Sequence, residues 1–144
     1  MTDTRTSKEN YYLGIADAVL DRSTCMRRKY GAIIVRNDEI ISTGYNGAPR
    51  GRQNCSTVGF CTRDYLDIPS GERYELCRSV HAEANAIISA ARRDMLGATL
   101  YLVGRDAKTG ELLRDTMPCC MCKRLIINAA ITQVVARTGE GEYG

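Results

Sequence analysis

The chain has no tryptophan, one phenylalanine and one histidine among its 144 residues. It contains no run of about 18 apolar residues, so we expect no transmembrane helix and no membrane partner. Residues 1–10 are polar and lack the apolar stretch of a signal peptide. No internal repeat, low-complexity tract or linker divides the sequence. We therefore expect one domain over residues 1–144, located in the cytoplasm, rather than a membrane-spanning, exported or repeat protein.

The composition is that of an ordinary globular domain. Hydrophobic residues make up 44% of the chain and charged residues 26%, values typical of a protein with a proper core. The net charge of +3 is mild and suits an anionic small molecule as well as a nucleic acid. Basic residues gather at Arg27-Arg28-Lys29 and Arg92-Arg93 without forming a pronounced stripe, so we expect no stable nucleic-acid partner.

The spacing of apolar residues predicts a helix over residues 7–20. The segments predicted after it are strands over 31–35 and 39–43 with a turn at 36–38, a glycine-rich loop over 44–49, an irregular region over 50–76, a helix over 81–93, a strand over 98–103, an exposed excursion over 104–115 with a turn at 108–110, a helix over 119–130 and a strand over 131–136. This order predicts a layered α/β domain with helices packed on a sheet.

Two motifs carry residues suited to metal chemistry. The single histidine lies in His81-Ala82-Glu83, and Pro118-Cys119-Cys120-Met121-Cys122 follows later in the chain. At the start of a helix, thiols three residues apart can point at one metal ion, and the helix N-terminus favours the thiolate form. Pro118 suits a helix entry, where a missing N–H costs nothing. One imidazole and two thiolates would hold zinc with its fourth position free for water.

Glu83 is close enough to His81 to reach the same site without being a ligand. Zinc lowers the pKa of its water towards about 7, and the glutamate can pass that proton to the ring nitrogen and leaving amine of a base. Each motif alone has a plainer explanation, because a lone C-x-x-C is also a redox pair, half of a structural zinc site or two core cysteines. Together they indicate a catalytic zinc held by His81, Cys119 and Cys122.

The pattern H-x-E … P-C-x-x-C resembles the signature of the cytidine and deoxycytidylate deaminase superfamily. Three longer motifs make the dCMP deaminase branch the most similar: Ser23-Thr24-Cys25-x-Arg27-Arg28, Gly44-Tyr45-Asn46-Gly47-Ala48-Pro49 and His81-Ala82-Glu83-Ala84-Asn85-Ala86-Ile87. The resemblance runs from about Ser23 to Arg137. It implies a three-layer α-β-α fold with a central mixed sheet, and a hydrolytic conversion of dCMP to dUMP and ammonia.

The resemblance also implies how a substrate is held. Asn46 would contact the deoxyribose, and the backbone of Ala82 would read the edge of the pyrimidine. Arg28 and Lys29, with Arg137 after the last strand, would hold the 5′-phosphate, because an arginine fork matches a phosphate dianion.

Regulation and assembly follow from the resemblance in the same way. Many relatives are hexamers controlled by dCTP and dTTP, so we expect a homo-oligomer, a hexamer or a dimer, with these nucleotides as effectors. The effector site would involve Gly44, Tyr45 and Gly47 of the glycine-rich loop, together with Arg92.

Seven cysteines in a reducing compartment call for metal or burial rather than for disulfides. Cys120 lies between the two thiolate ligands and is interpreted as a packed bystander. The other four flank or lie within the irregular region and have two interpretations: they hold a second, closed structural zinc, or they are small buried hydrophobes. These four are Cys25, Cys55, Cys61 and Cys77.

Two other functions stay open from the sequence. One is deamination of a different base, in free cytidine or deoxycytidine or in a tRNA adenosine, by the same chemistry. The other is a zinc-stabilised nucleotide sensor without catalysis, although such a binder has no need of Glu83 beside the metal.

Overall fold

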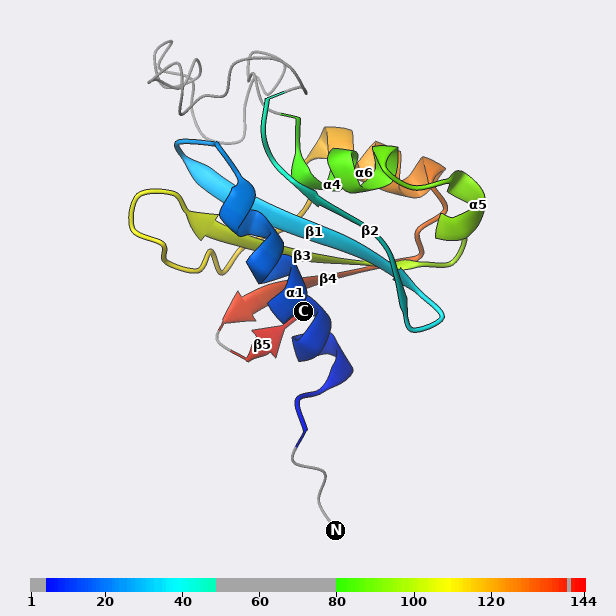
Figure 1. Ribbon diagram of the computed structural model, residues 1–144, viewed down its shortest axis with the longest axis horizontal. Helices are drawn as coiled ribbons and strands as arrows, with labels where there is room; N and C mark the ends of the chain where they lie inside the picture. The colour runs from blue at the N-terminus through cyan, green and yellow to red at the C-terminus, as the bar shows by residue number, and fades with distance from the viewer. Residues whose placement is uncertain (1–4, 49–79, 140) are drawn as a thin grey trace.

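The computed structural model describes residues 5–48, 80–139 and 141–144, which build a mixed sheet with helices on both faces (Figure 1). Within the described residues the elements are α1 (Lys8–Val19), η1 (Leu20–Arg22), β1 (Arg28–Arg36), β2 (Glu39–Tyr45), α4 (Ala82–Ile88), α5 (Arg92–Met95), β3 (Thr99–Asp106), α6 (Cys120–Asn128), β4 (Gln133–Gly139) and β5 (Glu142–Tyr143). Helix α1 packs on one face of the sheet, and α4, α5 and α6 pack on the other. The predicted three-layer α/β fold is therefore confirmed.

The strands follow the order β2-β1-β3-β4-β5. Strand β1 pairs antiparallel with β2 and β3, whereas β3 and β4 run parallel, so the sheet is mixed. The β1–β2 hairpin turns through Asn37 and Asp38, whose φ angles are 51° and 62°. Positive φ at both central residues matches the twist of the flanking strands, and asparagine and aspartate tolerate it well. The predicted turn at 36–38 is confirmed.

Side chains of β1 alternate between two hydrophobic cores, one on each face of the sheet. Ala32 and Ile34 pack on the face covered by α4 and α6, whereas Ile33 and Val35 pack on the face covered by α1. In the part of the chain that the structure describes, no helix is long and apolar enough to cross a membrane.

Two glycines let helices lie directly on strands. A Cβ at Gly31 would stand 2.0 Å from the backbone oxygen of Ala16 in α1. A Cβ at Gly44 would stand 2.4 Å from both the oxygen of Ala82 and the nitrogen of Ala86 in α4. Because real Cβ atoms do not approach backbone this closely, Gly44 fixes how near the first turn of α4 comes to β2.

The single helix predicted over 81–93 is wrong in its extent, because the chain forms two short helices there. Helix α4 ends at Ile88, and α5 begins at Arg92 after an extended Ala91. Ala86 and Met95 are both buried in the same core. They are nine residues apart, about two and a half helical turns, so a straight helix would place them on opposite sides. The break between the helices lets both side chains face the sheet.

Two features near the chain's C-terminal third also differ from the prediction. Strand β3 continues to Asp106, and the excursion folds back on it through an Arg105–Leu112 bridge, so residues 104–106 belong to the sheet. The turn predicted at 108–110 is present and is closed by the Asp106 carboxylate, which accepts the backbone N–H groups of Lys108 and Thr109 at 2.8 Å and 3.0 Å. The short strand β5 pairs with the end of β4 and was not predicted.

Candidate active site

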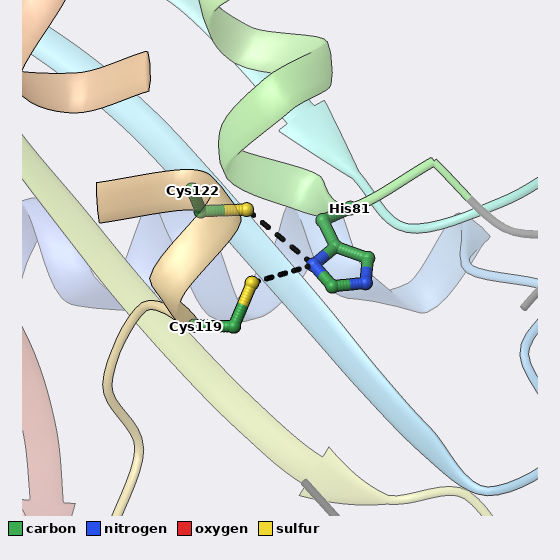
Figure 2. Close-up of side chains that lie close together, drawn as sticks. All are labelled: His81, Cys119 and Cys122. Atoms are coloured by element: carbon green, nitrogen blue, oxygen red, sulfur yellow. Dashed lines mark hydrogen bonds between the residues drawn. The ribbon is translucent and has the colours of Figure 1, made fainter. Parts of the chain in front are cut away.

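The N-termini of α4 and α6 meet and bring the two sequence motifs together. His81 is the N-cap residue of α4, and Cys119 is the N-cap residue of α6. Cys122 lies in the first turn of α6 and is buried. Figure 2 shows both cysteine side chains directed at the imidazole ring from the adjacent helix start. The prediction that each motif begins a helix is confirmed, with each helix starting one residue later than expected.

The three ligand atoms have the spacing that one zinc ion requires. The Nδ1 atom of His81 lies 3.3 Å from the Sγ atom of Cys119 and 3.4 Å from that of Cys122. Tetrahedral zinc, with bonds of about 2.3 Å to sulfur and about 2.05 Å to nitrogen, would separate such atoms by about 3.6 Å. All three ligand atoms lie within 4.8 Å of one another. One imidazole and two thiols are also the donor set of a zinc site with an open position.

The protein environment prepares one of the thiols for metal binding. The hydrogen bond from Cys122, aided by His81, lowers the pKa of Cys119 to about 3 against the opposing effect of burial. The same hydrogen bond, together with burial, raises the pKa of Cys122 in the metal-free protein. A metal ion that binds both sulfurs would displace the remaining thiol proton.

Glu83 lies beside the ligands in the first turn of α4. Its side chain is buried, with 5% of its surface exposed. Burial raises the pKa of its carboxyl group, which a hydrogen bond with its own backbone N–H and the charge of His81 oppose. A carboxyl group shielded from water next to a metal site is suited to carrying protons.

Asn46 directly follows β2 and is buried. Its Oδ1 atom accepts hydrogen bonds from the Ser23 hydroxyl and from the backbone N–H of Tyr30, the latter at 2.9 Å. Its Nδ2 atom donates to the backbone oxygen of Arg28 at 2.9 Å. Among the described residues, the oxygen of Asn46 thus accepts two hydrogen bonds and its nitrogen donates one, which leaves one N–H without a partner there.

The three basic residues predicted to hold phosphate lie on different faces of the sheet. Arg28 begins β1 and shares the face of Tyr30, Ala32 and Ile34, which is the face of the metal ligands. Lys29, one residue on, lies on the α1 face by the same alternation. Arg137 is buried on the α1 face, where its guanidinium donates to the side-chain and backbone oxygens of Asn10 at 3.2 Å and 3.4 Å.

Three of the residues predicted for an effector site lie at the end of β2, whereas the fourth, Arg92, lies on α5. Gly44 lies under α4 and Tyr45 ends β2, where 37% of its surface is exposed. Gly47 exchanges two backbone hydrogen bonds with Val80. Arg92 begins α5 and donates through Nε to the backbone oxygen of Asn128 in α6 at 3.0 Å.

Of the four cysteines assigned to a second zinc, only Cys25 lies among the described residues. It is a half-buried free thiol two residues after Ser23. Cys55, Cys61 and Cys77 lie outside the described residues, so the second zinc stays a prediction. Cys120 is exposed rather than packed, because it lies on the outer side of α6 while Cys122 faces inward.

Two residues with clear contacts near the site were given no individual role from the sequence. The Ser23 hydroxyl donates to the side-chain amide oxygen of Asn46. The side chain of Asn85 donates to the backbone oxygens of Tyr45 and Val80. Both lie inside the motifs Ser23-Thr24-Cys25 and His81-Ala82-Glu83-Ala84-Asn85. Their presence there is the signal that could have drawn attention to them.

Comparison with known proteins agrees with this geometry. Residues 6–138 match the family model described as the cytidine and deoxycytidylate deaminase zinc-binding region. The deoxycytidylate deaminase of Mycobacterium phage D29 is 41% identical over 132 residues, which cover 88% of this chain and 91% of the phage protein. That of Schizosaccharomyces pombe is 37% identical over 134 residues, covering 93% of this chain but 38% of the yeast protein.

Among solved structures, the dCMP deaminase from the cyanophage S-TIM5 in complex with dCMP and dUMP has a similar fold. Its TM-score is 0.63 at 25% identity, over 94% of this chain and 84% of that one. The predicted zinc cofactor is confirmed by the family match and by the ligand geometry. Because the matched region contains both motifs, and the fold joins them into one ligand set, this chain belongs to the cytidine and deoxycytidylate deaminase family.

Proposed function

We propose that this protein hydrolytically deaminates a cytosine mononucleotide, converting dCMP to dUMP and ammonia with the help of zinc. The observation that carries the proposal is the buried Glu83 carboxyl group beside a histidine and two cysteines spaced for one metal ion. The relatives named deoxycytidylate deaminase, and the S-TIM5 enzyme solved with dCMP and dUMP, support the choice of substrate.

His81, Cys119 and Cys122 would hold the zinc. When bound, zinc acts as a Lewis acid that makes water an effective nucleophile near neutral pH. Glu83 accepts the proton of the attacking water and delivers it to the ring nitrogen beside C4. It then takes the proton of the new C4 hydroxyl group and delivers it to the amino group. The amine leaves as ammonia while the C4 carbonyl forms, and the carboxylate is ready for another cycle. Burial keeps bulk water from competing for these protons.

The positions of the side chains support the expected substrate contacts. Asn46 offers its remaining N–H to a sugar oxygen, and the backbone of Ala82, which begins α4 beside His81, reads the edge of the base. Arg28 receives the phosphate because it lies on the same face of the sheet as the metal ligands. It begins β1, where its backbone oxygen accepts a hydrogen bond from the side chain of Asn46. Contributions of Lys29 and Arg137 stay predictions, and both residues lie on the α1 face.

The wider setting of the enzyme belongs to the same proposal. We expect regulation by dCTP or dTTP, a homo-oligomer (hexamer or dimer) and a cytoplasmic location, none of which follows from a single chain. Size measurement with and without dCTP and dTTP addresses the first two.

A substrate panel tests the proposed function. Purified zinc-containing protein is incubated with dCMP, deoxycytidine, cytidine, CMP and an adenosine-containing tRNA stem-loop, and ammonia release is followed. The proposal predicts release that is fastest with dCMP. Fastest release with a free nucleoside or with the stem-loop would overturn the substrate assignment, and no release from any of them would favour a sensor.

A further inference from the structure

We infer that Asn85 is a positioning residue, which sets where Asn46 stands relative to the metal ligand His81 by clamping the end of β2 to the residue before that histidine. Its effect on turnover rests on the proposed function. The clamp itself is a feature of the fold and has a readout of its own.

The side-chain amide of Asn85 reaches two segments at once. Its Nδ2 atom donates to the backbone oxygen of Tyr45 at 2.8 Å and to that of Val80 at 3.4 Å. Tyr45 directly precedes Asn46, and Val80 directly precedes His81. A primary amide nitrogen carries two N–H groups, so one side chain can satisfy both oxygens.

The two clamped segments are also joined to each other. The N–H of Gly47 donates to the oxygen of Val80 at 3.1 Å, and the N–H of Val80 donates to the oxygen of Gly47 at 2.6 Å. The backbone N–H of Asn85 in turn donates to the oxygen of His81 at 3.0 Å. The segments that contain Asn46 and His81 are therefore joined in one closed ring of hydrogen bonds. The side chain of Asn85 links the two sides of that ring.

The alternative is that Asn85 only fastens α4 to the sheet. Other residues already attach α4 to the sheet. The buried Ser42 hydroxyl donates to the backbone oxygen of Ala86 at 2.6 Å, and Gly44 lets the helix contact β2. Ser42 ties the same helix to the same strand but does not contact Tyr45, Gly47 or Val80 through any hydrogen bond among the described residues. It is the matched control, because its loss weakens the helix–sheet contact and leaves the ring intact.

The experiment compares Asn85→Ala, Asn85→Asp and Ser42→Ala with the wild type, all as full-length zinc-containing protein. Aspartate keeps the size of asparagine but has no N–H to donate, so it also answers the question if the alanine variant fails to fold. For each protein we would measure zinc content, melting temperature, kcat and KM for dCMP, and amide hydrogen exchange at Gly47 and Val80.

For both Asn85 variants we expect full zinc content, faster exchange at Gly47 and Val80, and a KM raised about tenfold. A tenfold change corresponds to about 1.4 kcal/mol, the size expected for one to two neutral hydrogen bonds. Ser42→Ala should lower the melting temperature about as much as the Asn85 variants do. It should leave KM and the exchange at these two amides unchanged.

Two results would overturn the inference. One is unchanged exchange at Gly47 and Val80 in the Asn85 variants. The other is a change of KM and exchange in Ser42→Ala as large as in the Asn85 variants. Failure of the proposed function looks different. Wild-type protein would then not deaminate dCMP, while the exchange comparison between Asn85→Asp and Ser42→Ala would still decide whether the clamp exists.

Discussion

Replacement of Glu83 by glutamine removes the proton carrier while changing little else. The amide has nearly the size of the carboxyl group, and Glu83 has only 5% of its surface exposed. Because burial opposes the charged form of this carboxyl and raises its pKa, a neutral amide suits the site at least as well. We expect Glu83→Gln to fold normally and to retain its zinc.

The rate is where the variant should differ. A positioned acid or base contributes typically about 10²- to 10⁴-fold to a rate, and Glu83 serves both the uptake of a proton from water and its delivery to the base. We therefore expect kcat to fall by at least about 10³-fold, with dCMP binding close to that of the wild type.

The assay is ammonia release from dCMP, with zinc content and dCMP binding measured on the same samples. Glu39→Gln is the control, because Glu39 is an exposed carboxylate at the start of β2, in the hairpin, and its loss should leave kcat unchanged. Activity of Glu83→Gln within about threefold of the wild type would refute the assignment of the proton carrier. A large loss of zinc would show that the side chain acts on the metal site instead.

Three further predictions concern phosphate, alkaline stability and a second metal. The kcat/KM for dCMP should exceed that for deoxycytidine by at least about 100-fold, because each lost charge-assisted contact costs about 1.5–3 kcal/mol. Arg28→Ala should reduce this ratio of the two kcat/KM values. Equal kcat/KM for the two substrates in the wild type would contradict the phosphate contact. The hydrogen bond to Asp38 raises the pKa of Tyr12 from 10.0 to about 12, so between neutral pH and pH 10 its contribution to stability is complete, and it is lost as the pH rises through about 12. The difference in melting temperature between the wild type and Tyr12→Phe should be constant up to pH 10 and shrink above it, and a constant difference would argue against this bond. Elemental analysis of protein purified without chelator should give two zinc ions per chain, one of which Cys55→Ala removes; a ratio of one would leave Cys25, Cys55, Cys61 and Cys77 as packing residues.

Local signals in the sequence correctly predicted which three side chains come together in a position to bind a metal ion. Pro118 and the spacing of Cys119 and Cys122 are properties of one helix start, and His81 with Glu83 is a property of another. Such short-range patterns survive folding because they depend on helix geometry alone. The hairpin at Asn37 and Asp38 was predictable for the same reason.

Features that depend on distant parts of the chain could not be predicted in this way. The break between α4 and α5 exists because Ala86 and Met95 must both face a sheet whose position the helix pattern does not contain. Likewise, the contact of Asn85 with Tyr45 joins residues 40 positions apart. Arg28 and Lys29 look equivalent in the sequence, but strand alternation places them on opposite faces of the sheet.

The proposed function requires that His81, Cys119 and Cys122 hold a zinc ion on which dCMP deamination depends. The most direct measurement is the rate of dUMP formation against zinc bound per chain, in the wild type and in Cys122→Ser, as metal is removed by a chelator and then restored. The wild type should lose activity as the zinc held by these residues is removed, and it should regain activity when zinc is added back. Cys122→Ser should bind less zinc and stay inactive after zinc is restored. Full activity of the metal-stripped wild type, or a Cys122→Ser variant with normal zinc and normal turnover, would contradict a catalytic zinc at this site.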